Sequence, residues 1–413
     1  MDTGNGAAAS WESPQAGHQV RLADKVVPLS AVRGGPARFT QLFARAKAEN
    51  GHAECLCATP PLKLVIRVRE GRYHLARWPG EGDRHTIGCG FHKVDPGLSG
   101  RGHYTDRAIL ETEDGTAIRL GAPLETQLAL RASEGGKSAR NGQVSGAASR
   151  RAVGLLGLLH WLWEETQLTM WDPSERRSWR TCHDRLVQQS TDCTVNGRDL
   201  STALYVVPPY RPQDAVRNAE GFAMFCAQVG RSRSIGRRGL IVGEIKDIYE
   251  TPYGKRLALR HLRSPLFASA ALIERVQSSY RIVFSAAVGD QARRVALFLV
   301  ERTSKDNLIV VDMAAMLTNQ ACVPADSSYE VRMADQLAAA GRSFVKPLRY
   351  EGDEVFPDFV ITDVTPHVYV EVYGVRGRRS YDERKRVKQD HYRKAAIPVI
   401  EWDVTQPLPE LSR

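Results

Sequence analysis

Long apolar runs and a signal pattern are both missing from the sequence. No run reaches the roughly 18 residues that a membrane-spanning helix needs, and the first residues do not follow the charged-then-apolar order of a secretory signal. These absences predict a cytoplasmic protein with no membrane partner. A phosphate-binding glycine motif is missing too, because Gly-Arg-Arg-Gly at 236–239 does not match one, so a P-loop nucleotide site is not indicated.

Cysteine is scarce, with seven in 413 residues, and the odd number argues against a disulfide framework. Three of the seven lie close together in the sequence near a histidine, which favours a metal site instead. The other four are expected to be reduced and partly buried: Cys182, Cys193, Cys226 and Cys322.

Negative charge is in the minority. The chain has 57 Lys and Arg against 47 Asp and Glu, a net charge of +10, which favours a polyanionic partner such as nucleic acid. The stretch 376–394 alone holds nine Lys and Arg against three Asp and Glu. The alternative is a basic surface that only contacts solvent.

Length and composition indicate several globular domains. At 413 residues the chain exceeds one ordinary core, and 42% hydrophobic with 25% charged residues is typical of chains that bury one. Residues 1–30 and 132–149 are rich in small residues, which predicts a loose leader and a linker. We therefore expect a zinc-stabilised β-rich module over 31–131, a mixed α/β region over 150–325 and a last domain over 326–413.

Hydrophobic periodicity and turn residues predict the elements ahead of the last domain. Helices are expected over 37–49, 151–168, 176–189, 214–229 and 268–279. Strands are expected over 62–69, 72–78, 108–113, 116–120, 240–248, 257–262, 296–302 and 308–312. Leucines and a tryptophan at helical spacing in 151–168 predict a core-facing stripe rather than a binding face: Leu155, Leu158, Leu159, Leu162 and Trp163.

Two short-spaced pairs of metal-ligand residues flank the first predicted hairpin. Cys55 and Cys57 precede it, and His85 and Cys89 follow it. Since a hairpin returns the chain to its start, the two pairs should face each other as a closed tetrahedral site, the form that structural zinc takes. His92 is an alternative fourth ligand, because Cys89-Gly90-Phe91-His92 also has a suitable spacing.

The last domain is predicted to contain a helix, three strands, a helix and a strand. The helices are expected over 329–340 and 381–395, and the strands over 344–350, 356–362, 368–375 and 397–403. Together with the β-rich module, this order predicts a multidomain α+β chain.

Two acidic residues are predicted to face each other in this domain. Asp363-Val364-Thr365-Pro366 is a good turn sequence, and a turn centred on it places Asp358 directly opposite Glu371. Their Cβ atoms would then lie about 5 Å apart, where like charges destabilise a strand pair. A magnesium or manganese ion between them would remove that repulsion.

These residues resemble the PD-(D/E)XK nuclease superfamily over roughly 326–405, with Pro357-Asp358-Phe359 and Val370-Glu371-Val372-Tyr373-Gly374 as the motif. The resemblance implies a restriction-endonuclease-like core in which the acidic pair and a backbone carbonyl bind divalent metal. It also implies that Glu330, on the first helix, assists. The motif lysine, two residues after the Glu, is replaced by Tyr373.

Some members of the superfamily carry that lysine on the following helix, and this chain offers candidates there. Tyr381, Lys385, Lys388 and Tyr392 share one helical face. We favour Lys388, with Lys385 second, as the group that orients the attacking water or neutralises the phosphate. The alternative is that the lysine is absent and the fold only holds DNA.

Arginines in the stretch 230–239 and in the basic stretch 376–394 are the predicted nucleic-acid contacts: Arg231, Arg233, Arg378, Arg379 and Arg384. For the run around Arg231 the alternative is an exposed basic loop without a ligand. No specific base-reading motif occurs in the sequence.

Further motifs resemble a second family over most of the chain. They are Cys55-Leu56-Cys57, Trp78-Pro79-Gly80-Glu81-Gly82, Leu159-His160-Trp161-Leu162-Trp163-Glu164, Gly243-Glu244-Ile245 and Tyr253-Gly254. These segments are similar to the bacterial domain of unknown function 1173 family, found on plasmids and integrative conjugative elements. The resemblance implies a mobile-element setting and supplies no reaction.

The sequence therefore predicts a DNA-binding protein with a magnesium-dependent endonuclease domain and a structural zinc. The first alternative is a non-catalytic accessory factor for transfer or maintenance of the element, built on a degenerate nuclease fold. The second is a defence or toxin-like nuclease that acts on RNA. Cleavage by Asp358→Ala and Glu371→Ala variants equal to that of the wild type would end the catalytic hypothesis.

Overall fold

The chain forms two compact units, Met1–His92 and Lys93–Arg413. The computed structural model describes residues 18–69, 71–127, 151–231, 235–350, 356–374 and 379–411. The start of the expected leader and the whole of the expected linker lie outside them. The boundary at 92 falls before strands that we had assigned to the N-terminal module, because one of these strands pairs with a strand of the middle region.

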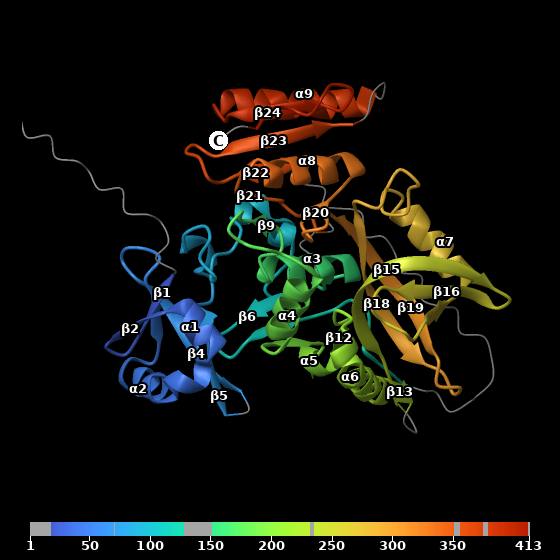
Figure 1. The fold of residues 1–413 in the computed structure, drawn as a ribbon, viewed down its shortest axis with the longest axis horizontal. Coiled ribbons are helices and arrows are strands. Elements are labelled where there is room, and N and C mark those ends of the chain that lie inside the picture. Colours follow the sequence, from blue (N-terminus) through green and yellow to red (C-terminus); the bar gives the residue numbers. More distant parts are fainter. Residues whose placement is uncertain are drawn as a thin grey trace, which may run out of the picture. The chain divides into compact units, whose positions relative to one another are not determined.

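The first unit is built on a five-stranded sheet rather than on a single hairpin. Its strands, in the order β2-β1-β3-β4-β5, are β1 (Gln19–Leu22), β2 (Lys25–Pro28), β3 (Ala53–Cys55), β4 (Leu62–Arg69) and β5 (Arg72–Arg77). Two α-helices, α1 (Leu29–Gly34) and α2 (Thr40–Asn50), and two 3-10 turns, η1 (Pro36–Phe39) and η2 (Gly82–Arg84), complete it. The predicted strands at 62–69 and 72–78 are confirmed (Figure 1).

Helix α2 packs on this sheet. Phe43 is fully buried and stacks on Tyr73 of β5, with ring centroids 5.3 Å apart. The helix ends at Gly51, whose φ of 73° is the left-handed conformation that terminates helices and favours glycine. The chain then enters β3, which ends at Cys55, the first residue of the predicted metal site.

All but one of the described α-helices of the second unit match predicted ones with shifted ends, and the exception, α5 (Leu200–Ala203), was not predicted. The others are α3 (Leu155–Glu165), α4 (Trp179–Ser190), α6 (Ala215–Gln228), α7 (Ala270–Ser279), α8 (Ser328–Ala339) and α9 (Arg379–Lys394), with 3-10 turns η3 (Pro96–Leu98), η4 (Gly100–His103) and η5 (Pro212–Asp214). In the part of the chain that the structure describes, no helix is long and apolar enough to cross a membrane.

Two small sheets flank the middle of this unit. One has the order β11-β10-β7-β6, from β6 (Ile109–Glu111), β7 (Thr116–Ile118), β10 (Cys193–Val195) and β11 (Arg198–Asp199). The other has the order β13-β14-β8, from β8 (Glu125–Gln127), β13 (Gly230–Arg231) and β14 (Ile235–Arg237).

A seven-stranded sheet forms the centre of the middle region. It contains β12 (Leu204–Val206), β15 (Gly239–Thr251), β16 (Gly254–Leu259), β17 (Leu266–Ala268), β18 (Arg293–Arg302), β19 (Leu308–Thr318) and β20 (Pro324–Ala325). The first half of β15 pairs with β18 and its second half pairs with β16. Since β16, β17, β19 and β18 also pair in that order, five strands close into a barrel.

The barrel has a core of its own, and one side of its wall is covered. Its interior includes Leu257, Leu266 and Phe298, and α7 adds Ile273 and Val276 to the same core. Residues of β15, β18 and β19 that point the other way join a separate core around α3. The predicted core-facing stripe of α3 is confirmed, because its four leucines and its tryptophan are all buried.

The C-terminal region follows the predicted order of helix, three strands, helix and strand. Its sheet has the order β24-β23-β22-β21-β9, from β9 (Met170–Trp171), β21 (Phe344–Val345), β22 (Phe359–Ile361), β23 (Val368–Tyr373) and β24 (Val399–Asp403). Strands β21, β22 and β23 are antiparallel, and β24 is parallel to β23. Helices α8 and α9 lie on opposite faces of this sheet (Figure 1).

The predicted strand over 344–350 is shorter than expected. Only two residues pair as β21, because the next residue whose backbone would face β22 is Pro347, which has no N–H to donate. The N–H of Lys346 faces the other edge and donates to the carbonyl of Thr169. At Tyr350 the backbone has a φ of 54°, which no strand residue adopts. On its other edge β21 pairs with β9, a strand from before α4 that the sequence did not predict.

Candidate functional site

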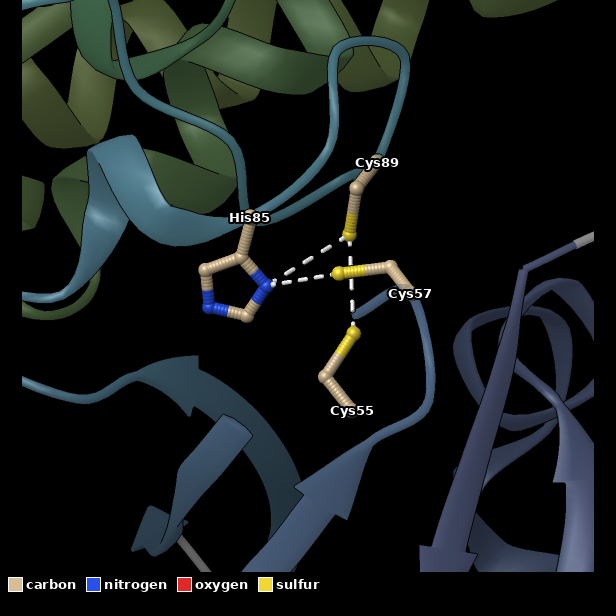
Figure 2. A group of neighbouring side chains, drawn as sticks. All are labelled: Cys55, Cys57, His85 and Cys89. Atoms are coloured by element: carbon tan, nitrogen blue, oxygen red, sulfur yellow. Dashed lines mark hydrogen bonds between the residues drawn. The ribbon is translucent and has the colours of Figure 1, made fainter. Parts of the chain in front are cut away.

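Four ligand residues converge in the first unit. Cys55 ends β3, Cys57 lies in the turn after it, and His85 and Cys89 lie in the segment beyond β5. One ligand atom from each residue lies within 4.8 Å of the others, so the group could hold a metal ion. Figure 2 shows the three sulfur atoms and the His85 ring pointing toward one common point.

The separations between these atoms suit a tetrahedral zinc ion. Zinc–sulfur bonds of about 2.3 Å and zinc–nitrogen bonds of about 2.0 Å place tetrahedral ligands roughly 3.5 to 3.8 Å apart. The Cys55 and Cys89 sulfurs are 3.6 Å apart, and His85 Nδ1 lies 3.2 Å from the Cys57 sulfur and 3.7 Å from that of Cys89. The donor set therefore fits zinc in both chemistry and spacing.

The histidine of this group is His85 and not His92. His92 is not part of this group, and its Nδ1 lies 2.7 Å from the carbonyl oxygen of His85. His85 Nε2 is buried and has no hydrogen-bond partner among the described residues. Contact between the two thiols lowers the pKa of Cys55 and raises that of Cys89, and burial raises the pKa of Cys57.

A second polar group lies in the C-terminal sheet of the second unit. Phe359 pairs with Val370, so the register of β22 and β23 is the predicted one. Asp358 directly precedes β22 and Glu371 directly follows Val370 in β23, and both side chains are buried near each other. The backbone N–H of Asp358 donates to Val370, and its Oδ2 accepts from the N–H of Val372 at 2.7 Å.

Lys388 reaches the acidic pair from α9. Its Nζ donates to both Glu371 oxygens, at 2.9 and 2.7 Å, and to the carbonyl oxygen of Phe356 at 2.9 Å. Tyr392, one turn further along the helix, donates its hydroxyl to Glu371 Oε1 at 2.5 Å. Two residues of the helical face that we singled out, Lys388 and Tyr392, therefore contact Glu371.

Lys385, our second candidate, lies elsewhere. Its Nζ lies 3.8 Å from the centroid of the Tyr373 ring, the residue at the motif lysine position. The Tyr373 hydroxyl donates to Glu401 on β24 at 2.9 Å. Lys385 thus stacks on an aromatic ring, whereas Lys388 contacts a carboxylate.

Sequence reasoning missed a lysine on the other side of the pair. Lys346 is only 1% exposed, and its Nζ donates to Glu330 Oε2 at 2.7 Å and to Asp326 Oδ2 at 2.9 Å. Its ammonium group also lies 5.5 Å from the Phe359 ring centroid. The available signal was a lysine directly after Phe344-Val345 in a predicted strand, where a buried charge requires partners.

Burial and mutual repulsion control the protonation of these groups. Burial raises the pKa of Glu330 to about 7, aided by Asp358 and opposed by Lys346. Burial likewise raises the pKa of Asp358, and Glu371 adds to it. Burial alone would lower the pKa of Lys346, but the surrounding carboxylates outweigh it and raise that pKa. When ionised, these carboxylates together carry more negative charge than the ammonium groups of Lys346 and Lys388 balance.

The arginines predicted to contact nucleic acid lie in β13, in α9 and outside the described residues. Arg233 and Arg378 lie outside the described residues. The structure gives Arg231 in β13, and Arg379 and Arg384 in α9, without describing their side chains.

The remaining cysteines are not part of the group formed by Cys55, Cys57, His85 and Cys89. Among them, Cys182 and Cys322 are buried next to each other.

Comparisons with known proteins give one match. No curated protein and no solved structure matches the chain. A family model described as protein of unknown function DUF1173 matches residues 30–405, which cover both units. The chain therefore belongs to the DUF1173 family of proteins of unknown function.

Proposed function

We propose that the second unit hydrolyses phosphodiester bonds of nucleic acid with a magnesium or manganese ion bound at Asp358 and Glu371. The observation that carries this proposal is the buried Asp358, directly before β22, near the buried Glu371 of β23, to which Lys388 donates. Buried acidic pairs persist where a cation compensates them. The order helix, three strands, helix, strand supports the same superfamily resemblance.

The charge of the group supports a divalent ion. The carboxylates are Asp326, Glu330, Asp358 and Glu371, and the ammonium groups are Lys346 and Lys388. When all are ionised, two negative charges are left uncompensated within the group. One divalent cation would balance them, and carboxylate oxygens are the ligands that magnesium and manganese prefer.

Each residue of the group would have a separate role. When bound, the ion supplies an activated water and positive charge beside the scissile phosphate. Asp358 and Glu371 would hold it. Lys388 is close enough to Glu371 to orient the attacking water or to stabilise charge on the phosphate. Glu330 and Lys346 would fix the side chains behind Asp358.

The test is cleavage of plasmid DNA in magnesium by the full chain. We expect nicking or linearisation by the wild type and loss of it in Asp358→Asn and Glu371→Gln. The matched control is Asp312→Asn, a half-exposed carboxylate on β19 that pairs with Arg275. Equal cleavage by all four proteins would mean that the activity comes from elsewhere. Binding without cleavage by the wild type would favour the accessory DNA-binding role.

RNA is the other substrate that the same chemistry could cleave. A parallel incubation with RNA of matched length separates the endonuclease from a defence or toxin-like ribonuclease. The family resemblance noted in the sequence also leads us to propose a setting on plasmids or integrative elements, where DNA is the expected substrate.

We propose in addition that the first unit carries a structural zinc ion at Cys55, Cys57, His85 and Cys89. The observation is the match of the sulfur and nitrogen separations to tetrahedral zinc. Four protein ligands leave no open position, so a role in folding rather than in catalysis is expected. Elemental analysis of protein purified without chelator should give one zinc per chain, and absence of stoichiometric metal would refute this assignment.

A further inference from the structure

We infer that the barrel of the second unit is an OB-fold and that the outer face of β15, β16 and β17 binds single-stranded nucleic acid. This surface is separate from the acidic pair and does not depend on that site being catalytic. The inference rests on the strand order of the barrel, on a row of side chains across three strands, and on which part of the barrel wall is left open.

The topology comes first. Along the chain the barrel strands are β15, β16, β17, β18 and β19, and around the barrel they pair in the order β15-β16-β17-β19-β18 and back to β15. Helix α7 lies between the third and fourth strands, and β17 runs parallel to β19. A five-stranded Greek-key barrel of this kind is the OB-fold, whose ligands bind on the face of its second and third strands.

A row of exposed side chains crosses that face. Tyr249 of β15 pairs in register with Arg256 of β16, and Arg256 pairs with Phe267 of β17. Side chains of directly paired residues lie on the same face of a sheet, so the three form one row. The Arg256 guanidinium lies 5.7 Å from the Tyr249 ring centroid. Phe267 pairs in turn with Ile309 of β19, which extends the row.

These side chains point away from the barrel core. Leu257 and Leu266, their neighbours along the strands, are fully buried in the interior. Tyr249 is 45% exposed and Ile309 is 37% exposed. Aromatic and apolar groups gathered on an outward face are typical of an interaction surface.

The part of the barrel's outer face that lies toward α3 is covered by other residues of the second unit. Leu297 of β18 and Ala314 of β19 point outward into the core around α3. Figure 1 shows α3 beside β18 and β19, with β16 on the far side of the barrel. Among the described residues, the outer face around Tyr249, Arg256 and Ile309 is therefore exposed.

The chemistry of the row selects the partner. Two aromatic rings around a guanidinium suit nucleobases, since every base has a face for stacking and the cation attracts phosphate. The turn between β15 and β16 adds Tyr253, which is 98% exposed. In an OB-fold this turn is one of the loops that contact oligonucleotides. Duplex DNA hides its bases, so a single strand is the ligand that fits.

The test is fluorescence anisotropy of a labelled oligothymidylate of about 20 nucleotides, longer than the roughly 4 to 16 that one OB-fold covers. The protein is the full chain with Asp358→Asn, without added divalent metal, so that cleavage cannot interfere. We expect Tyr249→Ala and Phe267→Ala each to weaken binding about fivefold to 100-fold. Arg256→Glu should weaken it and reduce its salt dependence.

Controls separate recognition from loss of folding. Tyr249→Trp should retain binding, because tryptophan also stacks. Tyr210→Ala removes another half-exposed tyrosine, outside the barrel, and should leave the affinity unchanged. Duplex DNA of the same length should bind more weakly than the single strand. Equal affinity of wild type, Tyr249→Ala and Phe267→Ala, or a preference for duplex, would overturn the inference.

Discussion

Glu164 is a carboxyl group inside the core of the second unit. Its Oε2 accepts hydrogen bonds from Ser99 at 2.8 Å and from Tyr350 at 2.9 Å, and its Oε1 has no partner among the described residues. Burial raises its pKa from 4.5 to about 8. The folded protein therefore keeps this proton at a pH where the unfolded chain has lost it.

This difference predicts the sign of a pH effect. Between pH 4.5 and 8 the unfolded state binds fewer protons at Glu164 than the folded state, so the free energy of unfolding falls as pH rises. Glu164→Gln should remove this contribution, which is on the order of a few kcal/mol at most. Urea unfolding at pH 5 and pH 8 measures it. The same pH dependence in both proteins would contradict the prediction.

A second residue-scale prediction separates the two lysines of α9. Lys388→Met should lower cleavage about 100-fold, the usual effect of removing one group that stabilises a transition state. It should leave binding of manganese intact or tighter, because it also removes a cation from Glu371. Lys385→Met should change cleavage less, since Lys385 contacts Tyr373 and not the carboxylates. Single-turnover rates and calorimetric manganese titrations give both readouts.

Single residues differed in how far the sequence could place them. Cys55, Cys57, His85 and Cys89 could be grouped because a short hairpin joins the two pairs. Lys388 could be favoured because its helical face contains Tyr392, which contacts the same carboxylate. Lys346 could not be, because its partners come from a helix and a loop that only the tertiary fold brings to it.

Among the elements, those defined by local pattern were predicted best. The β22–β23 register follows from the Asp363–Pro366 turn, which is fixed further by Arg342, whose Nη2 donates to Asp363 at 2.8 Å. Strand β9 has two residues and no pattern of its own, and β21 is short because Pro347 has no N–H to continue the ladder with β22. The barrel was missed because closure depends on β15 pairing with two different strands.

An element-scale prediction concerns the end of β3. Cys55→Ser should abolish zinc binding and destabilise the sheet of the first unit, because metal binding contributes directly to folding of small modules. Cys182→Ser is the control, since that buried cysteine lies outside the cluster. Zinc content and thermal unfolding report the two effects. Unchanged zinc content in Cys55→Ser would rule out this ligand.

At the scale of the whole molecule, each compact unit has a core of its own. The first contains Phe43 and Leu64, and the second contains the barrel and the α3 cluster. We expect a zinc chelator to lower the unfolding temperature of the first unit and to leave that of the second unchanged. Hydrogen exchange followed along the chain measures this. Equal loss of protection in both units would show that they unfold together.

The strand β9 sets a limit on how this protein can be divided. A fragment beginning at Asp326 would retain the acidic pair but lack β9, so β21 would become an open edge available to other chains. It would also lack the carbonyl of Thr169 that accepts from the backbone of Lys346. Gene fusions or deletions that keep the last domain therefore have to begin before Thr169, and fragments cut later should aggregate.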